Sequence, residues 1–224
     1  MRSRDRLVIA IDGPAGAGKS TIAKMLAERL GLRYVSTGLM YRAVTLKAIE
    51  SAVDPDDIGS ITRLARSCDI TFVWTDPATA RVYLDGRDVT SRLASPEVDA
   101  MVSPVSRVPE VREILTEKQR LLARDGGVVM EGRDIGTVVL PGADLKIFLT
   151  ASADERALRR AKQMEENGVK VNLTAVKQNI EARDDMDSRR SVAPLRRAPD
   201  AVVIDSTGKT PGEVLSEILR LLDA

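Results

Sequence analysis

Four residues near the start of the chain have the types and spacing of a phosphate-binding loop. Gly13, Gly18, Lys19 and Ser20 match the pattern G-x-x-x-x-G-K-[ST]. Glycines let the backbone turn so that successive N–H groups point at one place, where phosphate oxygens accept their hydrogen bonds. In such a loop the lysine reaches the β- and γ-phosphates of a nucleoside triphosphate, and the hydroxyl binds Mg²⁺. The spacing therefore predicts a nucleoside triphosphate site.

A strand and a helix must hold this loop in place. The run 7–11 is apolar and rich in β-branched residues, and the pattern over 22–30 is that of an amphipathic helix. The beginning of that helix adds the positive end of its dipole to the phosphate site. The predicted ATP-binding residues form one segment, with Ser20 as the metal ligand: Gly13, Pro14, Ala15, Gly16, Ala17, Gly18, Lys19, Ser20 and Thr21.

The composition excludes several classes of function. The chain has 224 residues, 34 Lys and Arg against 33 Asp and Glu, and a net charge of +1, which argues against a nucleic-acid polymer or a membrane surface as partner. With no histidine, neither His-based acid–base catalysis nor a common zinc site is available. The single cysteine, Cys68, and the absence of a long apolar run lead us to expect a soluble cytoplasmic protein.

Charged residues follow a second buried strand. The apolar run 128–130 is typical of a parallel strand, and Glu131-Gly132-Arg133-Asp134 follows it, at the sheet edge where ligands bind in α/β proteins. Arg42 lies on the first turn of a helix predicted over 39–52. Because a cation there opposes the helix dipole, we expect Arg42 to have an anionic partner.

Two strongly charged helices are predicted late in the chain, over 153–166 and 173–183, with a bend at Gly168 between them. The first contains Arg156, Arg159 and Arg160. One interpretation is a solvated helical hairpin. The other, which we favour, is a lid that brings arginines onto phosphates and excludes water.

The remaining periodicity predicts an α/β domain with an insertion. Further strands are expected at 32–35, 145–149 and 201–205, and a terminal helix at 211–222. Within 68–93, alternation interrupted by Asp-Pro and Asp-Gly pairs predicts a small antiparallel meander.

Three classes of protein are compatible with the phosphate loop: a kinase for a small acceptor, a regulatory GTPase and a mechanical ATPase. The N-K-x-D motif of common GTPases does not occur in the chain. The near-neutral net charge argues against a mechanical ATPase, because such a protein would need a charged surface to bind its polymer. Arginines at strand ends and in a lid favour the kinase, because phosphoryl transfer depends on positioning and charge stabilisation.

The chain also resembles the bacterial cytidylate kinases, which are nucleoside monophosphate kinases that phosphorylate CMP and dCMP. The motifs that carry the resemblance span nearly the whole chain: IDGPAGAGKST, STGLMYR at 36–42, EGRDIGTVV at 131–139, KIFLTAS at 146–152, RDDMD at 183–187 and APL at 193–195.

The resemblance implies a three-layer P-loop NTPase fold with a central parallel sheet, an inserted antiparallel subdomain and a helical lid. It implies one domain over 1–224, with a core of 1–40, 125–152 and 198–224, an acceptor-binding region with the insertion at about 41–112, and a lid at about 153–190. It further implies Mg²⁺ with ATP as phosphoryl donor, small-molecule partners only, and a monomer.

The resemblance also implies site residues. The CMP-binding set is Thr37, Arg42, Ser103, Arg112, Arg133, Asp134, Arg183, Asp187 and Arg190, and the catalytic set is Lys19, Arg133, Arg156, Arg159 and Arg160. Within the CMP set, Ser103, Arg112 and Asp134 are expected to read cytosine. Arg42, Arg133 and Arg190 are expected to hold the acceptor phosphate, and Arg183 and Asp187 to reach the ribose.

Two positions depart from the family pattern. Ser36 and Glu131 each stand where aspartate is common, so the role of Glu131 toward Mg²⁺ and the effect of Ser36 near the acceptor pocket are open. The alternatives to CMP phosphorylation are a kinase for another small acceptor such as UMP, and a non-catalytic nucleotide-binding regulator.

Overall fold

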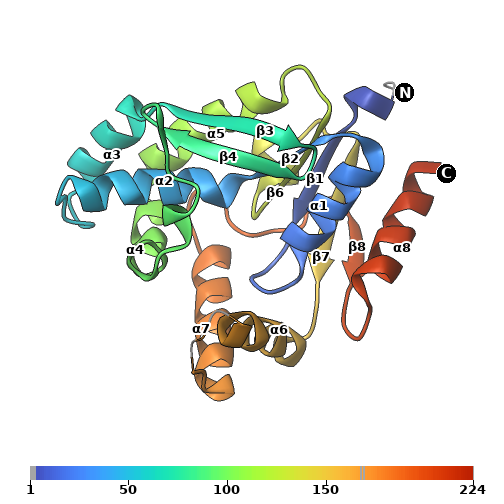
Figure 1. Cartoon of the computed structure of the whole chain (residues 1–224). Helices are drawn as coiled ribbons and strands as arrows, with labels where there is room; N and C mark the ends of the chain where they lie inside the picture. Colours follow the sequence, from blue (N-terminus) through green and yellow to red (C-terminus); the bar gives the residue numbers. More distant parts are fainter. Residues whose placement is uncertain (1–3, 167, 169, 224) are drawn as a thin grey trace.

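The fold is built on a five-stranded parallel sheet with the strand order β2-β6-β1-β7-β8 (Figure 1). Its strands are β1 (Val8–Asp12), β2 (Arg33–Ser36), β6 (Val128–Gly132), β7 (Leu145–Thr150) and β8 (Val202–Asp205). The computed structural model describes residues 4–166, 168 and 170–223. Residues 1–3, 167, 169 and 224, which the expected core and lid ranges include, lie outside the described residues.

Helices cover both faces of this sheet, so the predicted three-layer fold is confirmed. On one face, α1 (Lys19–Leu30) and α8 (Pro211–Asp223) pack on the alternate strand residues that include Ile9, Ile11 and Val129. On the other face, α5 (Pro109–Ala123) and the short helix η3 (Ile135–Val139) cover the residues of opposite parity, such as Ala10 and Met130. This alternation follows from the two-residue period of a strand, and burial of both faces explains why β1 and β6 are apolar nearly throughout.

A second apolar core joins the segments between β2 and β6. Its elements are α2 (Thr37–Glu50), α3 (Ile58–Ser67), the antiparallel strands β3 (Ile70–Asp76), β4 (Thr79–Leu84) and β5 (Arg87–Asp88), α4 (Pro96–Arg107) and α5. The predicted antiparallel meander is therefore confirmed. Two short 3₁₀ helices, η1 (Arg4–Arg6) and η2 (Arg92–Ala94), complete the described elements outside the late helices.

The meander reaches back to the edge of the parallel sheet. Near the β3–β4 turn, the carbonyl of Pro77 accepts the Tyr34 N–H at 2.8 Å, and the indole N–H of Trp74 donates to the Tyr34 carbonyl at 2.9 Å. Since β2 is an edge strand, these two bonds satisfy backbone groups that its outer side would otherwise leave to water. The insertion thus fixes the strand that leads into the phosphate-facing edge of the sheet.

The two late helices are α6 (Ala153–Glu166) and α7 (Leu173–Ser188), and they pack together below the loop that precedes α1 (Figure 1). We call this pair the lid. The helix α7 ends five residues later than the sequence pattern predicts, because buried Asp187 anchors its last turn to the site. The helix α4 continues through Pro104 to Arg107, because burial of Val105 stabilises another turn despite the N–H that proline lacks. In the part of the chain that the structure describes, no helix is long and apolar enough to cross a membrane.

Candidate active site

The predicted phosphate loop occupies the turn between β1 and α1, and its glycines are required by its geometry. Gly13, Gly16 and Gly18 have φ values of +147°, +78° and +90°, which side chains rarely allow. At Gly13 a Cβ would also lie 1.9 Å from the carbonyl oxygen of Leu149 on β7. The loop therefore passes close to the carboxyl end of β7 and places the N-terminus of α1 at the carboxyl edge of the sheet.

Lys19 is the first residue of α1 and is buried beneath this loop. Its Nζ donates to the Pro14 carbonyl at 2.8 Å, which folds the side chain back under the loop. Burial, together with the charge of Arg133, lowers the pKa of Lys19 to about 7. An anion at the loop would favour the charged form of this amine, so Lys19 is suited to hold phosphate oxygens.

The two departures from the family pattern lie against each other. Ser36 and Glu131 are paired in register between β2 and β6, and the Ser36 hydroxyl donates to Glu131 Oε1 at 2.7 Å. The predicted metal ligand Ser20 donates to the same oxygen at 3.0 Å. Ser36 therefore lies beside the phosphate loop, and not only near the acceptor pocket as the sequence suggested.

Asp12 is a site residue that the sequence analysis missed. Its two carboxylate oxygens accept the N–H groups of Ile135 and Gly136, each at 2.7 Å. Burial raises the pKa of Asp12 to about 6, in spite of these two bonds. The carboxylate at the end of β1 thus fixes the beginning of η3, and with it the charged segment after β6. Its position directly before Gly13 was the available signal.

A buried ion pair joins two of the three residues expected to read the base. Arg112 Nη2 donates to Asp134 Oδ2 at 2.7 Å, with side chains only 3% and 6% exposed. The guanidinium also lies 5.3 Å from the centre of the Tyr41 ring and donates to the Ser106 carbonyl at 3.2 Å. Arg112 Nε has no hydrogen-bond partner among the described residues. The Nε–H of Arg112 is therefore a buried donor that can bond to a ligand.

Ser103, the third expected base-reading residue, is connected to this pair through Ser106. The Ser106 hydroxyl donates to the Ser103 carbonyl at 3.1 Å, one turn earlier on α4. The structure thus places Ser103 on the helix that faces Arg112, with Ser106 making the direct contact. Sequence reasoning had no signal that separates these two serines.

Asp187 brings together two arginines that are far apart in the sequence. Arg133 Nε donates to Asp187 Oδ2 at 2.7 Å, and Arg190 forms an ion pair with Oδ1. Burial, followed by the charge of Arg133, lowers the pKa of Arg183, so this arginine lies in the same cationic environment. Thr37, the first residue of α2, is linked to β6, because its hydroxyl donates to the backbone carbonyl of Glu131 at 3.0 Å.

Arg42 has an anionic partner, Asp99 of α4. The helix dipole, from which the sequence predicted a partner, does not explain this pairing, because α2 begins at Thr37 and Arg42 therefore lies in its second turn. The other Asp99 oxygen lies 3.8 Å from Nη2 of Arg160 on α6. A carboxylate that the sequence analysis did not select therefore links an expected acceptor-binding arginine to the lid.

The lid contacts the phosphate loop directly, which contradicts the solvated-hairpin interpretation. Arg156 donates to the Ala15 carbonyl at 2.9 Å and forms an ion pair with Asp184, whose other oxygen accepts the Ala15 N–H at 3.0 Å. Arg159 donates to the Ser206 hydroxyl at 2.9 Å. A Cβ at Gly18 would lie 3.6 Å from Arg159, so this arginine also borders the loop.

Taken together, the contacts define two adjacent cationic regions. The first surrounds the loop and contains Lys19, Arg156 and Arg159. The second lies between α2, α4, α5, the end of β6 and the end of α7, and contains Arg42, Arg112, Arg133, Arg183 and Arg190. Aspartates from neighbouring elements offset these charges. Such a pair of regions suits two anionic ligands.

The oxygen donors beside Lys19 fit a hard divalent cation carried by a phosphate ligand. The exposed Ser20 hydroxyl and the Glu131 carboxylate supply oxygen, and Mg²⁺ is commonly held by one or two protein ligands plus substrate phosphates and water. The described residues contain no cluster of three or more His, Cys, Asp or Glu side chains arranged for a metal.

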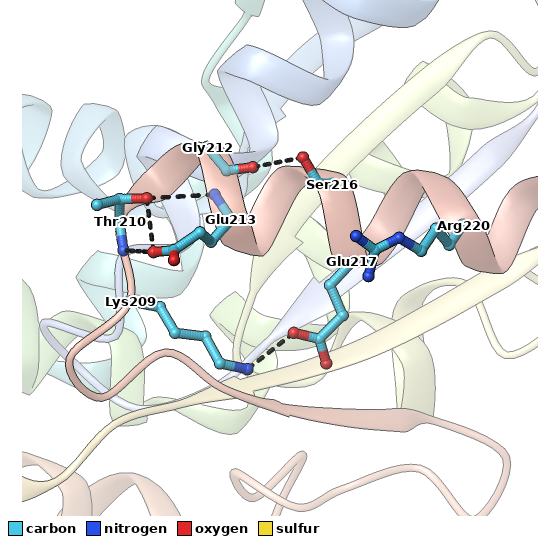
Figure 2. A pocket seen from close by; sticks show the side chains of 7 residues that line it. All are labelled: Lys209, Thr210, Gly212, Glu213, Ser216, Glu217 and Arg220. Carbon is cyan, nitrogen blue, oxygen red and sulfur yellow. Dashed lines mark hydrogen bonds and ion pairs between the residues drawn. The ribbon is translucent and has the colours of Figure 1, made fainter.

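A surface hollow at the beginning of α8 does not share these features. Figure 2 shows that most of its polar groups bond to one another. Lys209 Nζ donates to Glu217 at 2.8 Å, and the Thr210 N–H donates to Glu213 at 2.8 Å. None of the motif residues is among the described residues that line it.

Known proteins are similar to this chain in sequence and in fold. The family model described as cytidylate kinase matches residues 9–224. A cytidylate kinase from Symbiobacterium thermophilum is 49% identical over 214 residues, covering 96% of this chain and 95% of that protein. One from Desulforamulus reducens is 53% identical over 215 residues, with 96% of each covered. A solved structure of an uncharacterised protein from Eubacterium ventriosum is similar in fold alone, with a TM-score of 0.54, 14% identity, and 98% and 99% coverage.

Proposed function

The chain belongs to the cytidylate kinase family, and from that membership we propose that it transfers the γ-phosphoryl group of ATP to CMP and dCMP. The products are CDP or dCDP, and ADP. The observation that carries the proposal is the buried Arg112–Asp134 pair. Between Asp134 and the end of β6 lies Arg133, whose charge acts on Lys19 of the phosphate loop.

The pair has the hydrogen-bonding groups that cytosine requires. Cytosine presents an N4 amino donor beside the N3 and O2 acceptors. In our proposal Asp134 accepts from N4 while Arg112 donates to an acceptor on the ring. Uracil would turn its O4 oxygen toward the Asp134 carboxylate, and a buried polar group left unpaired disfavours the wrong base strongly.

The arginines around Asp187 are proposed to hold the acceptor phosphate. Arg133 and Arg190 are held side by side by that carboxylate, and Arg42 approaches from α2. The sugar would lie against Asp187 and Arg183. Asp187 tolerates dCMP as well as CMP when it contacts the 3′-hydroxyl, which both sugars carry.

The transfer itself is proposed to be a direct in-line displacement. An oxygen of the CMP phosphate attacks the γ-phosphorus, the bond from that phosphorus to the β–γ bridging oxygen breaks, and ADP leaves. A phosphate oxygen is already anionic, so no general base is needed. Lys19 and the lid residues Arg156, Arg159 and Arg160 offset the charge on the transferred group and keep water from the donor.

Mg²⁺ is proposed to arrive with ATP. When bound, the ion would supply positive charge that offsets the charge of the donor phosphates. The Ser20 hydroxyl and the Glu131 carboxylate would hold it, since their contact at 3.0 Å brings both oxygen donors to the start of α1.

The three-part division of the chain at the expected boundaries also stays a proposal, supported by separate apolar clusters for the sheet, the 41–112 region and the lid. We further propose that the protein acts as a monomer, because a single chain supplies every proposed site residue. We propose a cytoplasmic location from the single cysteine and the lack of a long apolar run in the sequence. Light scattering of the purified protein tests the monomer.

A coupled assay of ADP formation with CMP, dCMP, UMP and AMP tests the function. We expect CMP and dCMP to support rapid turnover, and UMP and AMP to be poor acceptors. Equal turnover with UMP would reject the assignment of the base, and turnover with none of the four would reject the assignment as a nucleoside monophosphate kinase.

A further inference from the structure

Three hydroxyl groups donate to a single oxygen of Glu131. Ser36, Ser20 and Tyr34 lie at 2.7, 3.0 and 3.2 Å from Glu131 Oε1. None of these three bonds involves the other carboxylate oxygen, Oε2. The side chain is therefore held by one oxygen.

The strand pairing explains why these groups meet. Residues 34 and 36 lie on the same face of β2 because side chains alternate along a strand, and Glu131 is the register partner of Ser36 on β6. Val129, two residues before Glu131, packs with α1 on that face. The three hydroxyls therefore approach the carboxylate from β2 and from the beginning of α1.

Tyr34 is fixed more firmly than a hydroxyl on an edge strand would ordinarily be. Its backbone N–H and carbonyl are both bonded to the meander, through Pro77 and the Trp74 indole. The inserted subdomain thereby contributes to the position of Glu131.

We propose that Ser36 and Tyr34 are positioning residues that hold Glu131 against Ser20, and that Ser36 and Glu131 work as a coupled pair. The long glutamate on β6 requires a hydroxyl opposite it on β2. An aspartate at 36 would replace the donor at 2.7 Å by a second carboxylate, which repels the first. This inference rests on the proposed function for the identity of the metal–nucleotide ligand.

The coupling has a geometric reason. An aspartate at position 131 is one methylene shorter, so it withdraws the carboxylate from the three hydroxyls and leaves space opposite position 36. An aspartate at 36 would then lie farther from the carboxylate at 131, so the two negative charges would repel each other less. Each single change is harmful, whereas the two together are compatible.

A double-mutant cycle tests the coupled pair. The variants are Ser36→Asp, Glu131→Asp and the double variant. The readout is the Mg²⁺ concentration that gives half-maximal binding of a fluorescent ATP analogue, which needs no acceptor. We expect each single change to raise this concentration by about 10-fold or more, as for partners of metal ligands generally. The double variant should return to within about threefold of the wild type. If the two effects simply multiply, the inference is wrong.

A second comparison separates positioning from a merely structural role. Ser36→Ala and Tyr34→Phe remove one hydroxyl each, and Ser36→Thr is the matched control that retains it. We expect the two deletions to raise the half-saturating Mg²⁺ concentration while leaving the KM for CMP unchanged, and Ser36→Thr to restore it. Equal behaviour of Ser36→Ala and Ser36→Thr would overturn the positioning role.

These readouts distinguish the two proposals. A protein that binds the analogue in a Mg²⁺-dependent way, shows the coupling and yet fails to phosphorylate CMP would reject the proposed function alone. Thermal melting identifies any variant that fails to fold. In that case the Ser36→Ala and Ser36→Thr comparison, which introduces no charge, decides the question.

Discussion

The buried ion pair between Arg112 and Asp134 gives the sharpest test of the site, because one change should alter both stability and base selectivity. We consider Asp134→Ala and Asp134→Asn. The alanine leaves the Arg112 guanidinium, 3% exposed, without its carboxylate partner. The asparagine keeps a hydrogen-bond acceptor in nearly the same place but removes the charge.

The expected loss of stability follows from the burial of the pair. Removing one partner of a buried ion pair costs about 3–5 kcal/mol. Arg112 keeps its contacts with the Ser106 carbonyl and the Tyr41 ring, so we expect Asp134→Ala to fall near the lower value, about 3 kcal/mol. For a domain of this size that corresponds to a fall in Tm of about 6–12 °C. Asp134→Asn should lose about half as much.

The expected change in selectivity follows from the donors and acceptors of the two bases. Asparagine can turn its amide N–H toward the O4 oxygen of uracil, whereas aspartate cannot donate. A paired base contact is worth about 1–3 kcal/mol, so the ratio of kcat/KM for CMP to that for UMP should fall by about 10- to 100-fold in Asp134→Asn. Asp134→Ala should lose activity with both bases.

Differential scanning fluorimetry and steady-state kinetics on the two variants make the comparison. Folded variants with an unchanged ratio of CMP to UMP would show that the base is read elsewhere. An unchanged Tm in Asp134→Ala would show that Arg112 does not depend on this carboxylate.

Three further outcomes are expected. Lys19→Met should lower kcat by at least about 10³-fold, because the transferred charge loses its buried cation, while calorimetry should find CMP binding nearly intact; normal turnover would refute the role of the loop. Gly13→Ala should prevent binding of ATP or stable folding, as seen in analogue titration and melting, since its Cβ would lie 1.9 Å from a backbone oxygen. Burial raises the pKa of Asp12 to about 6. Between about pH 4 and 6 the native carboxyl holds a proton that the unfolded chain has released, so stability should fall as the pH rises through this window, by up to about 3 kcal/mol relative to Asp12→Asn. A constant difference between wild type and Asp12→Asn in urea titrations over this range would contradict that expectation.

Much of the fold could be predicted from the sequence, because its signals are local. The apolar strand before Gly13, the helix after Ser20 and the breaks in the meander each depend on neighbouring residues and on fixed periods. The rule that ligands meet the carboxyl ends of parallel strands also placed the segment after β6 at the site in advance of any structure. These local signals identify the lysine and arginine side chains that can take part in the site.

Only the tertiary structure decided which carboxylate faces which cation. Asp99 links Arg42 to Arg160, and Asp184 joins Arg156 to the loop, through contacts between helices that are remote in the sequence. No periodicity reports such contacts, since they depend on how α4, α6 and α7 pack.

The contact between Ser36 and Glu131 also has a part that the sequence determines and a part that only the tertiary structure decides. By itself the sequence indicated that a hydroxyl residue lies near the end of one strand and an acidic residue near the end of another. Their contact depends on the parallel register of β2 and β6 across 95 positions of the chain, and on the meander that fixes Tyr34 beside them. Register depends on the burial of whole strands. The departures from the family pattern at Ser36 and Glu131 therefore look independent in the sequence and form one contact only in the assembled sheet.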